Sequence, residues 1–139
     1  MTDSAAIESR IDALAAAPDP AAAVAELLRL GEETLCRWVA AAAETPTTGR
    51  REGFRLLALH RQGARGRPSF NACRETCREL AYHYNLIRLE PEHPETAHRL
   101  RMAAMVAKHL HLFVTGKMRD AGLGEFCCAS RPLRQAADR

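Results

Sequence analysis

The sequence predicts an all-α protein, a single-domain helical bundle of about five helices. Apolar residues recur at steps of three and four along several segments, which is the spacing of one face of an α-helix. Stretches of strict apolar and polar alternation, the signature of half-buried strands, do not occur. Aromatic residues make up only 5% of the chain, so small and aliphatic side chains must form most of the core. Such side chains fill a helical bundle well.

The length of 139 residues suits one domain with one core. We expect residues 1–139 to form a single helical domain, with residues 126–139 as an irregular C-terminal tail. No apolar run approaches the roughly 20 residues that span a bilayer, and the first residues do not resemble a signal peptide. The excess of arginine over lysine is typical of GC-rich coding. We therefore expect a bacterial, cytoplasmic protein with no membrane partner.

Breaks at proline and glycine divide the chain into its expected helices. These cover residues 4–17, 20–44, 50–62, 69–89 and 94–118. Asp19 and Pro20 favour the start of the second helix, as a capping residue and a first-turn residue. Gly31 lies inside that helix, where it costs about 1 kcal/mol relative to alanine and indicates a kink or a close helix crossing.

We expect the rest of the chain to be arranged around the helix predicted at residues 69–89. Its apolar face is formed by residues 70, 73, 77, 80, 84 and 87. Ser69 follows a proline and is the expected N-cap. Arg74, Glu75, Arg78 and Glu79 form the opposite, solvated face.

The helix expected at residues 94–118 is apolar on two sides, which predicts a central position in the bundle. One row contains Leu100, Ala104, Ala107, His111 and Val114, and the other contains Met102, Met105, His109 and Phe113. Gly122 and Gly124 indicate its end, with a left-handed residue after the last turn.

Cys73 and Cys77 lie one turn apart on the apolar face, so together they could ligate a soft metal ion. Buried cysteine more often packs as a small hydrophobic residue, and we favour that interpretation. Cys127 and Cys128 could complete a four-thiolate zinc site, although adjacent cysteines are poorly spaced for one.

Tyr82, His83, Tyr84, His109 and His111 are the candidate ligand-binding residues, between the helices at 69–89 and 94–118. Two of them, His109 and His111, lie in apolar rows, where a buried imidazole needs a polar partner. We predict that at least one is buried against a polar group of another helix. Tyr82, Tyr84, Glu79 and His83 are the expected partners, and a partnered core histidine is the simpler interpretation.

Six arginines and one glutamate fall between residues 50 and 67. Arg61, Arg65 and Arg67 are the candidate anion-binding residues, because guanidinium groups bind phosphate with forked donors. Solvated arginines are the alternative. The net charge of +3 is low and no aromatic residues interleave the arginines, so we do not expect a nucleic-acid partner.

These observations favour a non-catalytic binding or accessory protein with a ligand pocket between helices. One alternative is a metal- or thiol-dependent redox protein that uses Cys73, Cys77 and a histidine. Another is a structural subunit whose alanine-rich second helix self-associates, with a second copy or another protein as partner. The sequence identifies no cofactor.

Overall fold

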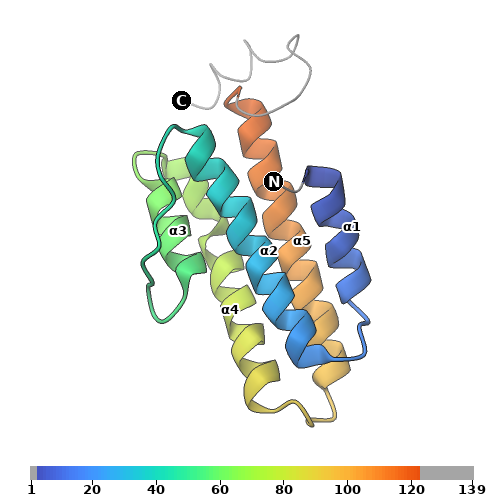
Figure 1. The fold of residues 1–139 in the computed structure, drawn as a ribbon. Coiled ribbons are helices and arrows are strands. Elements are labelled where there is room, and N and C mark those ends of the chain that lie inside the picture. Colours follow the sequence, from blue (N-terminus) through green and yellow to red (C-terminus); the bar gives the residue numbers. More distant parts are fainter. Residues whose placement is uncertain (1–2, 123–139) are drawn as a thin grey trace.

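The structure, a computed structural model, describes residues 3–122 and is all-α (Figure 1). Its elements are α1 (Ser4–Leu14), α2 (Pro20–Ala41), α3 (Arg55–Ala64), the 3-10 helix η1 (Pro68–Cys73), α4 (Arg74–Leu89) and α5 (Thr96–Asp120). No strand forms within residues 3–122. The predicted helical bundle is confirmed. The tail expected at 126–139, with Cys127 and Cys128, lies outside the described residues.

Helix α5 is central, as its sequence predicts. It packs against α1, α2, α4 and η1, while α2 packs against all four other α-helices. Helices α1 and α4 run opposite to α2 and α5, and α1 and α3 flank the bundle on opposite sides (Figure 1). The buried residues of the alanine-rich helix α2 thus contribute to this chain's own core.

The two apolar rows of α5 differ in burial. The row from Leu100 to Val114, including His111, is buried. The second row is only partly buried, because Met105 is 64% exposed and His109 is exposed. Phe113 of the same row packs against the core, with its ring centroid 6.0 Å from that of Phe70.

Several local predictions are confirmed. The Asp19 carboxylate accepts a hydrogen bond from the Ala22 N–H at 3.2 Å, and Pro20 is the first residue of α2. Gly31 marks a close helix crossing, because a Cβ atom there would lie 3.0 Å from Cδ2 of Leu80. Gly122 has a φ of 75° just after α5 ends, as expected of a left-handed residue.

Two predicted helix starts are wrong. Helix α3 begins at Arg55, because Arg51 and Phe54 exchange two backbone hydrogen bonds of 3.0 Å across a tight turn. Glu52 and Gly53, the central residues of that turn, have φ values of 54° and 85°. The segment at residue 69 begins as a 3-10 helix, and no side chain caps it or α4.

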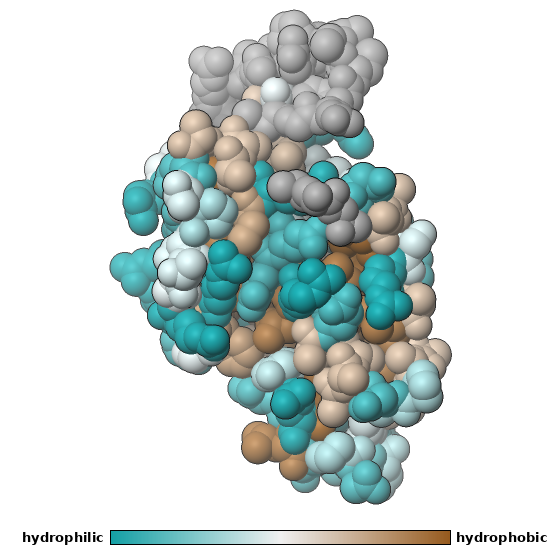
Figure 2. Space-filling model, viewed as in Figure 1, coloured by the Kyte–Doolittle hydropathy of each residue, from teal (hydrophilic) through white to brown (hydrophobic). Residues whose placement is uncertain are grey.

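Figure 2 shows hydrophilic residues over much of the face seen in Figure 1, with apolar groups between them. In the described part of the chain, no helix is both long and apolar enough to cross a membrane.

Candidate functional site

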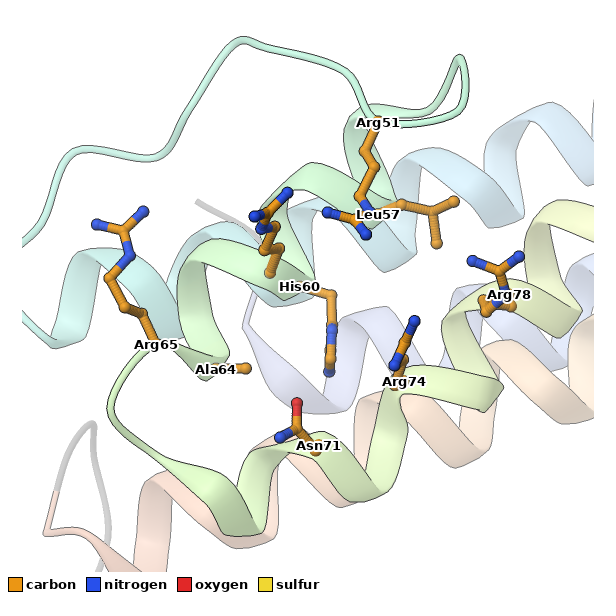
Figure 3. Close-up of a pocket in the computed structure, with 9 residues that line it drawn as sticks. Arg51, Leu57, His60, Ala64, Arg65, Asn71, Arg74 and Arg78 are labelled. Atoms are coloured by element: carbon orange, nitrogen blue, oxygen red, sulfur yellow. The ribbon is translucent and has the colours of Figure 1, made fainter.

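An arginine-lined cleft of about 450 Å³ lies between α3 and the segment formed by η1 and α4 (Figure 3). We call it the arginine cleft. It is lined by Arg51, Leu57, His60, Arg61, Ala64, Arg65, Asn71, Arg74 and Arg78. Five of these nine residues are arginines, so the cleft concentrates positive charge far beyond the chain's modest net charge.

Helical spacing brings these residues together. Leu57, His60, Arg61 and Ala64 recur at steps of three and four on one face of α3. Asn71, Arg74 and Arg78 do the same along η1 and α4. The two faces meet because α3 packs against η1 and α4, and the turn before α3 adds Arg51. In Figure 3, Asn71 and Arg74 extend from η1 and α4 toward α3, and Arg65 lies at the far edge.

The arginines of the cleft fall into two groups by their partners. Arg78 binds the Glu52 carboxylate with both terminal nitrogens, at 2.8 and 3.1 Å, and Arg51 lies 3.9 Å from the same carboxylate. The Arg78 guanidinium holds the pKa of Glu52 below its usual range. Within residues 3–122, Arg61, Arg65 and Arg74 make no hydrogen bond or ion pair. Their donors are available to an anion.

His60 forms the buried wall of the cleft. The residue is 5% exposed, and its Nε2–H donates to the carbonyl oxygen of Phe70 at 3.1 Å. The imidazole also stacks on the Phe70 ring, with centroids 5.5 Å apart and planes inclined by 18°. These contacts fix the orientation of the histidine between the two helices (Figure 3).

The Phe70 carbonyl oxygen links α3 to the segment that carries the cysteines. It accepts hydrogen bonds from His60 of α3 and from the Cys73 thiol, the latter at 3.3 Å. The backbone turns here with 3-10 geometry, in which the Arg74 N–H bonds to the Asn71 carbonyl.

The two buried cysteines lie behind His60. Cys73 is 1% exposed and Cys77 is fully buried. The Cys77 thiol, and then His60, lower the pKa of the Cys73 thiol, while burial opposes them. The pKa of Cys77 rises, because its thiol interacts with Cys73 and is itself buried. The two buried thiols therefore differ in acidity, and Cys73 is the more acidic one.

The three predicted anion-binding residues do not lie together. Arg61 and Arg65 line the arginine cleft. Arg67 does not, because its guanidinium lies over the Trp38 ring, 5.1 Å from the centroid. Trp38 in turn stacks on Phe70 with centroids 4.5 Å apart. Arg67 therefore covers the core instead of facing the cleft.

The predicted ligand-binding residues of α4 have different surroundings. Tyr82 is 59% exposed, whereas the Tyr84 ring packs edge-on against Phe54 at a centroid distance of 5.7 Å. His83 is half-buried, and its buried Nδ1 has no hydrogen-bond partner in the part of the chain that the structure describes. Burial lowers the pKa of His83.

The prediction of a buried, partnered histidine on α5 is confirmed for His111. It is 1% exposed, and its two ring nitrogens lie 2.9 Å from the Ser4 hydroxyl and 3.4 Å from the Thr34 hydroxyl. The expected partners on α4 are wrong, because His111 faces α1 and α2. His109 lies two residues away on the opposite side of α5 and is exposed. The five side chains therefore do not line one common pocket.

The predicted metal ligands Cys73 and Cys77 do adjoin a histidine, His60. Among residues 3–122, however, no group of three or more histidine, cysteine, aspartate or glutamate residues is arranged to hold a metal ion.

Sequence reasoning did not select five polar residues of the arginine cleft, namely Arg51, His60, Asn71, Arg74 and Arg78. The last three recur at helical spacing, and we interpreted Arg74 and Arg78 only as a solvated face. The signal that could have identified them is that this face follows the arginine-rich segment directly in sequence. A short loop between two helices favours their packing side by side.

Comparison with protein-family models, curated proteins and solved structures finds no match to this chain.

Proposed function

We propose that this protein binds a small polyanionic ligand, a phosphate ester or polyphosphate, in the arginine cleft, and that it is a non-catalytic binding or accessory protein. The observation that carries the proposal is the set of five arginines around a cleft of about 450 Å³, three of which make no hydrogen bond or ion pair among the described residues. The ligand pocket between helices expected from the sequence is thus relocated from α4 and α5 to α3 and α4.

Physical chemistry supports an anion in this cleft. Like-charged guanidinium groups repel one another, and within residues 3–122 only the Glu52 carboxylate is bonded to them. A phosphate group relieves this repulsion and accepts forked hydrogen bonds from arginine, which are stronger than neutral ones. The volume also falls within the range of small-molecule sites. Solvation of the arginines by water is the competing interpretation.

Titration calorimetry with pyrophosphate tests the proposal. Arg74→Gln removes an unpaired charge from the cleft, and we expect its dissociation constant to rise about tenfold, as for loss of one charged hydrogen bond of roughly 1.5 kcal/mol. Arg101→Gln is the matched control, because Arg101 is exposed on α5, does not line the cleft and undergoes the same charge change.

A melting curve gives a second readout. Bound pyrophosphate should raise the melting temperature by mass action in the parent protein and in Arg101→Gln, and less in Arg74→Gln. An unchanged melting curve and no heat across millimolar pyrophosphate would contradict the proposal and leave only solvated arginines.

Thiol chemistry at Cys73 is a second candidate function, supported by the lowered pKa of this thiol beside Cys77 and His60. A thiolate is the reactive form of cysteine. If this function holds, iodoacetamide should label native Cys73 faster than the half-buried Cys36, and Cys77→Ser should slow that labelling. Preferential labelling of Cys36 would indicate that burial keeps Cys73 inert.

A further inference from the structure

A second cleft continues from the arginine cleft along the junction of α3 and α4. Its volume is about 420 Å³, and it shares Leu57 and Arg78 with the arginine cleft. The two clefts are therefore adjacent, with the ion pair of Arg78 and Glu52 at their boundary. An elongated ligand could occupy both at once.

The two clefts differ in chemistry. The second cleft contains the carboxylates of Glu52, Glu75 and Glu79 in place of unpaired arginines. It also contains two aromatic side chains, Phe54 and Tyr82. A ligand that spans both must place its anionic end on the arginines, because carboxylates repel phosphate. Its other end must be uncharged or a hydrogen-bond donor.

From this juxtaposition we infer that the ligand is a nucleotide, with its phosphates in the arginine cleft and its nucleoside in the second cleft. This inference rests on the proposed function and names the class of ligand. Tyr82 is 59% exposed and offers a ring face to a base. The amide of Asn85 matches the mixed donors and acceptors of a base edge, and the Glu79 carboxylate can accept from ribose hydroxyls.

The anchoring of the aromatic residues supports this assignment. The Tyr82 ring contacts His83 edge-on, with centroids 5.5 Å apart, which limits its orientation while it remains exposed. Phe54 is held edge-on against Tyr84. A sugar phosphate carries hydroxyl groups but no flat unsaturated ring, so it would leave these aromatic faces unused.

The test compares three probes of similar charge by titration calorimetry without magnesium: ADP, pyrophosphate and fructose 1,6-bisphosphate. Stacking on an aromatic side chain contributes about 1–3 kcal/mol per base, so ADP should bind the full chain about tenfold more tightly than either other probe. Tyr82→Ala should bring the dissociation constant of ADP to that of pyrophosphate, which should itself not change.

Leu89→Ala is the matched control, because Leu89 is an 80% exposed apolar residue on the same helix that does not line the cleft. It should keep the preference for ADP. Equal binding of all three probes, or a preference for ADP that survives Tyr82→Ala, overturns the inference and leaves polyanion binding intact. Absence of binding by every probe overturns the proposed function, and the inference with it.

Discussion

Trp38 and Gly63 fit together so closely that no side chain can be added between them. The indole N–H donates to the Gly63 carbonyl oxygen at 2.9 Å. A Cβ atom on Gly63 would lie 2.6 Å from Cδ1 of Trp38, closer than real Cβ contacts allow. This contact joins the end of α2 to the end of α3. It thereby fixes the helix that carries His60 and Arg61 into the arginine cleft.

Gly63→Ala should therefore destabilise the protein by about 1–3 kcal/mol, the usual cost of overpacking a core, despite the better helix propensity of alanine. Gly116→Ala is the matched control. Gly116 is a helical glycine of α5 whose added Cβ would meet no atom of residues 3–122 within 4 Å, so alanine there should stabilise by up to about 1 kcal/mol. Urea denaturation measures both changes. A Gly63→Ala variant as stable as the parent would contradict the tight contact.

The helices could be predicted because capping residues and apolar repeats involve residues that are close together in the sequence. Asp19 and Pro20 start α2, and the apolar repeat places Phe70, Cys73 and Cys77 in the core. The turn at 51–54 was missed because Glu52 adopts a left-handed conformation that non-glycine residues rarely take. Its ion pair with Arg78 is a tertiary contact between residues 26 positions apart.

The candidate site was harder to predict because tertiary packing, and not local sequence, brings its residues together. Arg61 and Arg65 stood out by local charge, whereas Arg74 and Arg78 join them only through the packing of α3 on α4. Arg67 has the same local sequence context as Arg65, yet it lies over Trp38, a contact that no periodicity encodes.

The carboxylate at the edge of the arginine cleft should weaken anion binding. Glu52→Gln keeps the shape of the side chain but removes the charge that now neutralises Arg78. We expect Glu52→Gln to have a several-fold lower dissociation constant for pyrophosphate than the parent protein. In 1 M salt the difference between the two proteins should be smaller, because screening is stronger there. Glu92→Gln, an exposed change in the turn between α4 and α5, should have no such effect. Unchanged affinity in Glu52→Gln would mean that pyrophosphate does not approach Arg78.

The buried cysteines should act mainly as core residues. Cys73→Ala and Cys77→Ala should each lower the free energy of unfolding by roughly 1 kcal/mol, as expected for loss of a small buried group. Cys36→Ala should cost less, because Cys36 is only half-buried. Urea denaturation measures these values. If the parent protein binds a metal ion or turns over peroxide, and either core variant abolishes this, the redox alternative is favoured instead.

His111 should make the stability of the bundle depend on pH. The Thr34 hydroxyl donates to the Leu30 carbonyl at 2.9 Å, so it accepts from Nδ1–H of His111. Nε2 then accepts from the Ser4 hydroxyl, which describes a neutral imidazole joining α1, α2 and α5. Burial lowers the pKa of this histidine, against the opposing influence of Glu8.

The sign of the pH dependence follows from that lowered pKa. Above a pH of roughly 6.5, His111 is neutral in both the folded and the unfolded states, and its contribution to stability is complete. As the pH falls below that value, the unfolded state takes up a proton first, so the free energy of unfolding decreases until the folded pKa is passed.

His111→Leu should reduce this decrease in the free energy of unfolding between pH 7 and pH 5. His109→Leu, a change at an exposed position two residues away, should leave it unaltered. His83 also has a lowered pKa, so some decrease should persist in His111→Leu and be lost when His83→Leu is added. Identical profiles for the parent and His111→Leu would show that this imidazole does not control the docking of α1.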